Sequence, residues 1–471
     1  MTAVSDSLIF RTILSTPASA SIWSDTARTS YYLRIEAALA AVQARLAIVP
    51  QRAADEIVKC CDVTLVDWER LERETVLVGY PVLGVVRQIV GRVNEVEGGL
   101  GEWMHWGATT QDITDTATVL QLRDTLTLVG ECFDSVTESL SELCETHKTT
   151  PVAARSNLQK AVPMSFGFKL ARLLATFHRH RTRLAELRSR LLVLEFGGAA
   201  GTLATIPEVG LRCQEELAKE LGLAVPDIAW HTERDRIAEA GAFFALVTGT
   251  CAKFALDVKL MMQTEVGEVS EPYVPHRGSS STMPQKRNPI SCAYITAMAS
   301  TVRQLSAALF DAMVEDHERS TGPWEIEWIV LPQICTLTHA TLKQTSELIA
   351  GLEVHPAAMQ KNLEISKGAI VSEAVMMGLG KTLGRQYAHD LVYDLCREAA
   401  KTGKPLLELL IEHPEVKLSR QELEKLCDPA NYLGYSVEMV EKVLRLVKQE
   451  EARLSTAPAP SHQTLIPGDP L

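Results

Sequence analysis

Residues 235–268 read DRIAEAGAFFALVTGTCAKFALDVKLMMQTEVGE, and this stretch decides the fold class. Its apolar residues recur at spacings of three and four, which is the pattern of a helix. Strand-like alternation is nearly absent from the chain. Most of the helical stretches exceed the usual length of about 11–12 residues, so the sequence predicts an all-α protein with a long central bundle. The other predicted helices are Tyr31–Val49, Asp115–His147, Pro163–Leu194, Pro289–Glu315 and Ile329–Leu352.

Clusters of glycine and proline separate these helices and mark loops, because glycine permits backbone conformations that are closed to other residues. We predict an N-terminal helical domain over residues 1–113 and a central long-helix bundle over residues 114–355. A C-terminal helical domain is expected over residues 356–454, followed by a flexible tail over residues 455–471. The breaks lie at Gly98–Gly101, Gly197–Gly201, Gly278 and Gly322-Pro323.

The charge, hydropathy and cysteine content of the chain exclude several classes of function. The 471 residues carry a formal net charge of -12 at pH 7, which argues against a nucleic-acid partner because phosphate backbones need a basic footprint. No uninterrupted apolar stretch of about 18 residues occurs, so we expect no membrane span. The ten cysteines form no CxxC pair and have no histidine at metal-ligand spacing. Met1–Ala20 lacks the pattern of a secretory leader, so we expect reduced thiols, no metal site and a cytoplasmic protein.

The segment with the most specific chemistry is Gly278–Pro289, GSSSTMPQKRNP. Its small residues form a loop that enters a helix at a proline, which makes it a candidate mobile lid. Backbone N–H groups at the helix start, the Lys286 ammonium and the Asn288 amide form a predicted donor cluster. Such a cluster suits a carboxylate whose negative charge grows during a reaction. The alternative interpretation is a serine-rich surface turn followed by a helix cap.

This segment closely resembles the GSSxMPxKxNP signature of the superfamily that contains fumarase, aspartase, argininosuccinate lyase and adenylosuccinate lyase. The resemblance implies that Ser280 is the catalytic base and that Lys286 and Asn288 contact a substrate carboxylate. Ser281 and Met283 in the same loop are expected substrate contacts.

A serine is a poor base at its ordinary pKa. The role that the resemblance gives Ser280 therefore requires loop N–H groups and Lys286 to stabilise its alkoxide when the lid closes. Ser279 replaces the glycine usually found before that serine, so the flexibility of the loop is expected to differ.

Residues 105–112, HWGATTQD, precede a predicted long helix and resemble the superfamily's first signature block, HxGxTSxD. The resemblance implies that the hydroxyls of Thr109 and Thr110 bind a substrate carboxylate. His105 is either a catalytic proton donor or anion contact, or a packed, hydrogen-bonded histidine. We interpret Asp112 as a helix cap.

Residues 155–163, RSNLQKAVP, align with the second block, commonly TH-x-Q-x-A-x-P. Fumarase-like members place a proton-donating histidine where Asn157 stands, whereas cycloisomerases often have tryptophan there and histidine where Lys160 stands. Asn157 can hydrogen-bond a substrate oxygen but cannot donate a proton as an acid. We expect Asn157, Gln159 and Lys160 to contact the substrate, and the departure argues against a simple fumarase, aspartase or adenylosuccinate-type elimination.

Residues 196–204 (FGGAAGTLA) and 230–236 (WHTERDR) resemble the cycloisomerase versions of these regions. His231 and Arg234 are predicted substrate contacts, because arginine recognises carboxylates with two parallel hydrogen bonds. The alternatives are an interface histidine and a structural Arg–Asp pair. Glu318–Ser320 resembles the superfamily's connection between the fourth and fifth bundle helices, and we interpret it as structural.

The resemblance extends from about residue 20 to about residue 450 and points to the 3-carboxy-cis,cis-muconate cycloisomerase branch. It implies three helical domains, a homotetramer with a multi-helix core, active sites shared between subunits, and no metal or organic cofactor. The implied reaction is cycloisomerisation of a small unsaturated polycarboxylate resembling 3-carboxy-cis,cis-muconate, through an aci-carboxylate carbanion. Three alternatives stay open: a decarboxylase or isomerase of trans- or cis-aconitate, an adenylosuccinate-lyase-like β-elimination, and a non-catalytic crystallin-like protein.

Overall fold

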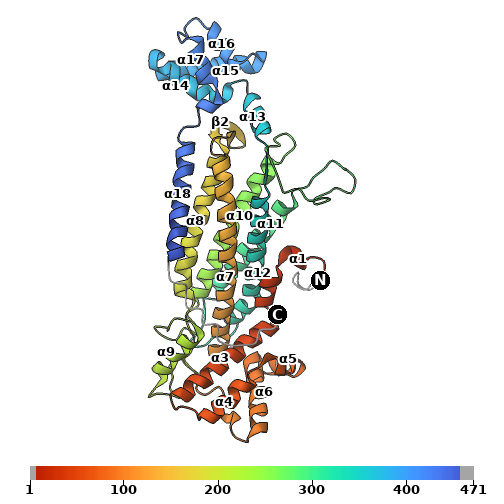
Figure 1. Cartoon of the computed structure of the whole chain (residues 1–471), viewed down its shortest axis with the longest axis vertical. Helices are drawn as coiled ribbons and strands as arrows, with labels where there is room; N and C mark the ends of the chain where they lie inside the picture. The colour runs from red at the N-terminus through yellow and green to blue at the C-terminus, as the bar shows by residue number, and fades with distance from the viewer. Residues whose placement is uncertain (1–6, 457–471) are drawn as a thin grey trace.

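The structure is a computed structural model that describes residues 7–456. Long helices run along one axis of the molecule and form its central bundle (Figure 1). The predicted all-α fold is confirmed, since the described strands are confined to two small two-stranded sheets. The bundle helices are α7 (Thr110–Thr146), α8 (Phe166–Leu191), α10 (Asp235–Met261), α11 (Ile290–Asp311) and α12 (Pro323–Ala350).

Helix α10 is the centre of the bundle core. It packs against α8, α11 and α12, and Phe244, Val247 and Cys251 are fully buried in the core that these helices share with α7. An 18-residue window of α10 has a mean hydropathy of 1.4, which would suit a membrane span, but half of that window is buried inside the protein. Each large apolar side chain buried in this way contributes about 1.5–3 kcal/mol, so α10 is accounted for as a core helix.

Three bundle helices begin several residues away from their predicted starts. Helix α12 begins at Pro323 instead of Ile329, because Pro323 takes the first helical position and Glu325 accepts a hydrogen bond from the Gly322 N–H. Helix α7 begins at Thr110 instead of Asp115, because the Asp112 carboxylate accepts a hydrogen bond from the Thr109 N–H and caps the helix start. Helix α8 begins at Phe166 instead of Pro163, because residues 151–165 form an antiparallel hairpin of β1 (Pro151–Ser156) and β2 (Gln159–Ser165).

The N-terminal helices form a second core at one end of the bundle, together with residues far along the chain. Leu194, Cys213 and Trp230 are buried in the same cluster as Tyr32 and Val85, so the connection between α8 and α10 belongs spatially to this end. The elements here are α3 (Asp25–Arg45), α4 (Gln51–Cys60), α5 (Trp68–Val78), α6 (Pro81–Val96), α9 (Gly210–Leu221), and the 3-10 turns η2 (Val63–Leu65) and η3 (Gly101–Trp103). Helices α1 (Arg11–Leu14) and α2 (Pro17–Ile22) pack against the bundle helices instead.

The other end of the bundle is covered by shorter helices with a core of their own (Figure 1). Helix α18 (Ser436–Thr456) leaves this group and runs back along α8, and Val440 and Val447 are buried in the bundle core. The region predicted as one C-terminal domain thus gives its last helix to the bundle. The remaining elements are α13 (Pro356–Glu364), η4 (Ala369–Val371), α14 (Ser372–Leu383), α15 (Arg385–Thr402), α16 (Leu406–Glu412), α17 (Arg420–Cys427), η5 (Pro429–Asn431), β3 (Val269–Ser270) and β4 (Glu353–Val354).

The predictions for the cysteines and for the C-terminal tail can also be compared with the structure. All ten cysteines are free thiols, as the sequence predicted. The predicted tail over residues 455–471 lies almost entirely outside the described residues, which end at residue 456.

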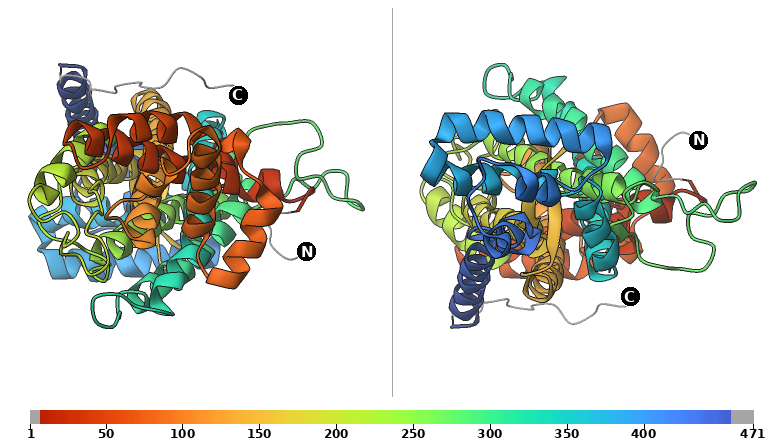
Figure 2. Two further views of the ribbon diagram at one scale, coloured as in Figure 1. Left: turned by 90° about the horizontal axis from the view of Figure 1, so that it is seen from below. Right: turned by 90° about the horizontal axis from the view of Figure 1, so that it is seen from above.

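This architecture separates the three signature segments of one chain. The Thr109–Thr110 turn and the 151–165 hairpin lie at opposite ends of α7, whose 37 residues span roughly 55 Å at about 1.5 Å per residue. The loop between β3 and α11 projects sideways from the bundle, as the end-on views also show (Figure 2). One protomer therefore does not bring the three segments together.

Candidate functional site

The loop that contains Ser280 is closed at its neck by Gly278 and Asn288. The backbone N–H and the side-chain amide of Asn288 both donate to the Gly278 carbonyl, at 2.8 and 2.9 Å. Gly278 has a φ of +69°, and a Cβ there would lie 2.4 Å from the Asn288 carbonyl oxygen, so a side chain does not fit. One N–H of the Asn288 amide therefore shapes the loop, and the contact of Asn288 with a substrate carboxylate stays a prediction.

Ser280 lies in a local nest of backbone donors. Its Oγ accepts hydrogen bonds from the N–H groups of Thr282, at 3.3 Å, and Met283, at 3.2 Å. Hydrogen bonds to a charged form favour that form, so these donors stabilise a developing alkoxide. Ser281, Met283 and Lys286 are exposed in the same loop, around the half-buried Ser280.

The start of α11 does not provide the donors that the sequence predicted. The buried carboxylate of Glu271 accepts from the N–H groups of Ser291, at 3.3 Å, and Cys292, at 2.8 Å. This carboxylate already occupies the helix N-terminus. The predicted use of these N–H groups by a substrate is therefore wrong, and Ser280 and Lys286 are the groups of the loop that we consider further.

The Thr109–Thr110 turn forms a second half-buried group of donors at the start of α7. The guanidinium of Arg319 donates to the Thr109 hydroxyl, which places a cation beside the two threonines. We interpreted the stretch around Arg319 as structural from the sequence alone. The sequence signal that could have indicated a site residue was an arginine in the connection between two long helices, within a stretch that already resembled a family pattern.

His105 lies next to this turn and is paired with an acid. Its Nδ1 lies 2.6 Å from Glu36 Oε1, and the Glu36 side chain is buried. Burial opposes protonation of the imidazole, but the negative charge and hydrogen bond of Glu36 outweigh it, so the pKa of His105 is raised. A cationic imidazole is thereby favoured beside the threonines.

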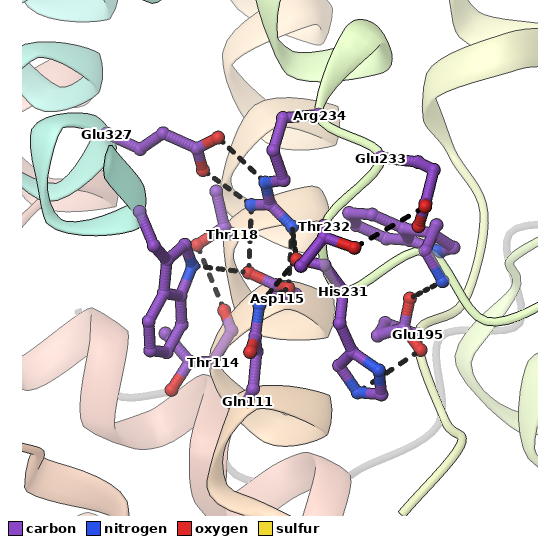
Figure 3. Close-up of polar contacts among 12 residues, drawn as sticks. Gln111, Thr114, Asp115, Thr118, Glu195, His231, Thr232, Glu233, Arg234 and Glu327 are labelled. Atoms are coloured by element: carbon purple, nitrogen blue, oxygen red, sulfur yellow. Dashed lines mark hydrogen bonds and ion pairs between the residues drawn. The ribbon is translucent and has the colours of Figure 1, made fainter. Parts of the chain in front are cut away.

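His231 and Arg234 come to the same end of the bundle but are fully buried (Figure 3). His231 Nε2 lies 2.8 Å from Asp112 and 3.5 Å from Glu195. The ligand-type atoms of these three residues lie within 4.8 Å of one another, an arrangement that could hold a metal ion, which the sequence did not predict.

Arg234 forms bidentate pairs with two carboxylates from different helices (Figure 3). Its Nη atoms lie 2.7 and 3.0 Å from the oxygens of Asp115, and its Nε and Nη2 lie 2.9 and 2.5 Å from those of Glu327. Glu315 lies 3.9 Å away and has no hydrogen bond to either oxygen. This is the structural Arg–Asp pair, and it leaves Arg234 no free edge for a substrate carboxylate.

The hairpin presents Asn157 at its tip. Asn157 and Leu158 have φ values of 50° and 63°, which is the geometry of a two-residue hairpin turn. Both are exposed, as is Gln159. Lys160 instead donates to the Asn362 carbonyl on α13 at 2.6 Å, and burial followed by the charge of Arg155 lowers the pKa of Lys160.

Comparisons with known proteins agree with this architecture. The family model described as lyase matches residues 11–303, and the model described as adenylosuccinate lyase C-terminus matches residues 368–443. The protein named trans-aconitate decarboxylase 1 of Mycosarcoma maydis is 58% identical, over 92% of this chain and 87% of its own length.

Cycloisomerases are also similar to this chain in sequence and structure. The 3-carboxy-cis,cis-muconate cycloisomerase of Pseudomonas aeruginosa is 43% identical, over 90% of this chain and 93% of its own. The crystal structure of the 3-carboxy-cis,cis-muconate lactonizing enzyme of Pseudomonas putida superposes with a TM-score of 0.89 at 38% identity, covering 94% of this chain and 99% of that one. This chain therefore belongs to the lyase family of the aspartase/fumarase superfamily, with close relatives in its 3-carboxy-cis,cis-muconate cycloisomerase branch.

Proposed function

We propose that this enzyme decarboxylates an unsaturated tricarboxylate such as trans-aconitate. The observation that carries the proposal is Asn157, exposed at the hairpin tip where eliminating members of the superfamily place a proton-donating histidine. An amine or hydroxide leaving group needs a proton from such an acid. Carbon dioxide leaves without one, so a decarboxylase loses nothing by having asparagine there. The relative named trans-aconitate decarboxylase 1 supports the same choice.

The chemistry balances with one proton and no cofactor. Trans-aconitate has a CH2-carboxylate next to a carbon–carbon double bond whose far carbon bears another carboxylate. Breaking the bond between the CH2 carbon and its carboxylate releases CO2 and shifts an electron pair across the double bond. The charge is then delocalised into the far carboxylate as an aci-carboxylate, and one proton added to that carbon gives a methylidene dicarboxylate.

The residues divide into a proton donor and an anion clamp. We assign the proton donor to Ser280, because two backbone N–H groups stabilise the alkoxide that it becomes. The clamp combines Thr109 and Thr110 with Arg319 and Lys286, whose fixed charges stabilise the aci-carboxylate more than the ground state. The cationic form of His105 and the amides of Asn157 and Gln159 complete the set of polar groups that we assign to the substrate.

The fold of one protomer holds these groups apart, which supports a site shared between chains. We propose a homotetramer whose helix bundles pack together, so that the loop of one subunit closes over the turn and hairpin of others. The exposed apolar side chains of α10 and α11, such as Leu246, Leu256 and Phe310, fit this packing.

Cycloisomerisation of a 3-carboxy-cis,cis-muconate-like substrate is the second candidate. The cycloisomerases at 38–43% identity favour it, and its aci-carboxylate intermediate would use the same clamp. Asn157 and Lys160 depart from the tryptophan and histidine that are common in that branch, so we rank it second.

A substrate panel tests the assignment. Purified enzyme is incubated with trans-aconitate, cis-aconitate, 3-carboxy-cis,cis-muconate, fumarate and adenylosuccinate, and CO2 release and proton NMR spectra are followed. We expect CO2 and a methylidene dicarboxylate from an aconitate, with one solvent deuteron incorporated in heavy water. Lactone formation from the muconate without CO2 release from any acid would replace the decarboxylase assignment by the cycloisomerase.

A further inference from the structure

The Asp112 carboxylate connects the Thr109–Thr110 turn of the proposed clamp, through hydrogen bonds, to buried groups of the protein. Its Oδ2 accepts from the N–H groups of Thr109, at 2.9 Å, and Gly198, at 3.0 Å. Its Oδ1 accepts from the Gly197 N–H at 3.0 Å and pairs with His231 Nε2 at 2.8 Å. Both lone pairs of each oxygen are then used. The position of the threonine turn therefore depends on the partners that hold Asp112.

Glu195 completes a buried trio with His231 and Asp112. Its Oε2 accepts from the Trp230 N–H at 2.7 Å, whereas its Oε1 is buried without a hydrogen bond and faces His231 Nε2 at 3.5 Å. The three side chains are at most 3% exposed. Two carboxylates and one imidazolium would leave one net negative charge away from water, which is costly. A proton on Glu195 removes that charge.

We propose that Glu195 and His231 are positioning residues of the clamp, and that the proton on Glu195 controls how strongly the Thr109–Thr110 turn holds a tricarboxylate. The inference rests on the proposed function. His231 transmits the effect, since its Nε2 lies beside both Asp112 Oδ1 and Glu195 Oε1.

The direction of the pH dependence follows from the charges around Glu195. Burial raises the pKa of Glu195 to about 8; the His231 charge opposes this rise, and the carboxylates of Asp112 and Asp115 reinforce it. Glu195 is therefore neutral below that pH and negative above it. The added negative charge near the clamp repels a trianion, so affinity is expected to fall as pH rises through about 8.

Calorimetric titration with propane-1,2,3-tricarboxylate tests this without any turnover. For the unmodified enzyme the Kd should weaken about 10-fold between about pH 7 and about pH 9, the scale of one unit charge acting through a protein interior. Glu195→Gln keeps an acceptor for the Trp230 N–H but cannot ionise, so its Kd should weaken much less over this range than that of the unmodified enzyme. The loss that remains in the variant reports the deprotonation of His105. Glu233→Gln is the matched control, because Glu233 is exposed and two residues from His231, and it should follow the unmodified enzyme.

Two substitutions of His231 separate positioning from mere packing. His231→Gln can still direct an N–H at Asp112 and should bind almost as the unmodified enzyme does. His231→Leu leaves Asp112 without one hydrogen bond and should weaken binding about 10-fold at neutral pH. If the leucine variant does not fold, the Glu195→Gln titration still decides the question.

The outcomes are distinct. Identical pH dependence in the unmodified enzyme and Glu195→Gln, or undiminished binding by folded His231→Leu, overturns the positioning role alone. A stoichiometric divalent metal ion in the purified enzyme also overturns it, because the ion would take the place of the shared protons. No binding of the tricarboxylate by the unmodified enzyme at any pH contradicts the clamp, and with it the proposed function.

Discussion

Ser280→Ala is expected to lower kcat by about 10²–10⁴-fold, the usual contribution of a positioned proton donor. The reason is specific to the loop: the Thr282 and Met283 N–H groups stabilise an alkoxide at this position, and alanine offers no proton. The thermal unfolding temperature should not change, because the substitution removes a hydroxyl from a partly exposed loop. Steady-state kinetics on the substrate found by the panel, with a thermal melt, measure both quantities.

Gln285→Ala is the matched control for the loop. Gln285 is exposed five residues further along the same loop, and its loss should leave kcat within about twofold. A Ser280→Ala enzyme that keeps most of its kcat would remove Ser280 from the proton transfer and leave the loop as a surface turn.

Arg234→Met is expected to cost about 3–5 kcal/mol of folding free energy, the usual effect of removing one partner of a buried ion pair. The variant would leave Asp115, Glu327 and the unpartnered Glu315 buried without a cation. Urea unfolding at one fixed protein concentration measures the loss. Arg190→Met is the control, because the Arg190–Glu239 pair is exposed and its loss should cost at most about 1 kcal/mol.

The loss should also depend on pH. Burial raises the pKa of Glu315 to about 7 and also raises the pKa of Glu327. A carboxyl with a raised pKa in the folded state stabilises that state below the pKa, and the stabilisation is lost as pH rises through it. The Arg234 charge opposes the rise of both pKa values in the unmodified enzyme, so these pKa values should rise further in Arg234→Met. The difference in stability between the variant and the unmodified enzyme should therefore be smaller near pH 5, where the carboxyls of the variant are protonated, than near pH 8. A difference that is constant with pH would mean that the network does not take up protons.

The helix bundle followed from local patterns, whereas much of the site did not. Periodicity placed the start of α10 at Asp235, as found, because a buried helical face repeats within the sequence itself. The partners of Arg234 lie 93 and 119 residues away, and no local pattern distinguishes an arginine that binds substrate from one that binds distant carboxylates. The binding of the Glu271 carboxylate to the start of α11 could not be predicted for the same reason, because Glu271 lies 21 residues from Cys292 in the sequence.

The hairpin at 151–165 was missed for a different reason. Pro163 was interpreted as a helix start, yet it pairs with Ala153 on the opposite strand. Asn157 and Leu158 both adopt left-handed conformations. The turn contains no glycine, which is the usual sequence signal for a two-residue hairpin turn. The signature blocks themselves were found from the sequence. Their proposed meeting between chains follows from the family resemblance and not from a local pattern, because assembly is not encoded in any one segment.

Complementation between inactive variants tests the shared site most directly. Ser280→Ala and Thr109→Val are each purified, then unfolded and refolded together, with mixed oligomers verified by native mass spectrometry. If the loop and the turn of one site come from different subunits, random mixing restores about a quarter of the sites and of the unmodified activity. Mixed oligomers that stay as inactive as their parents would contradict a site built between subunits.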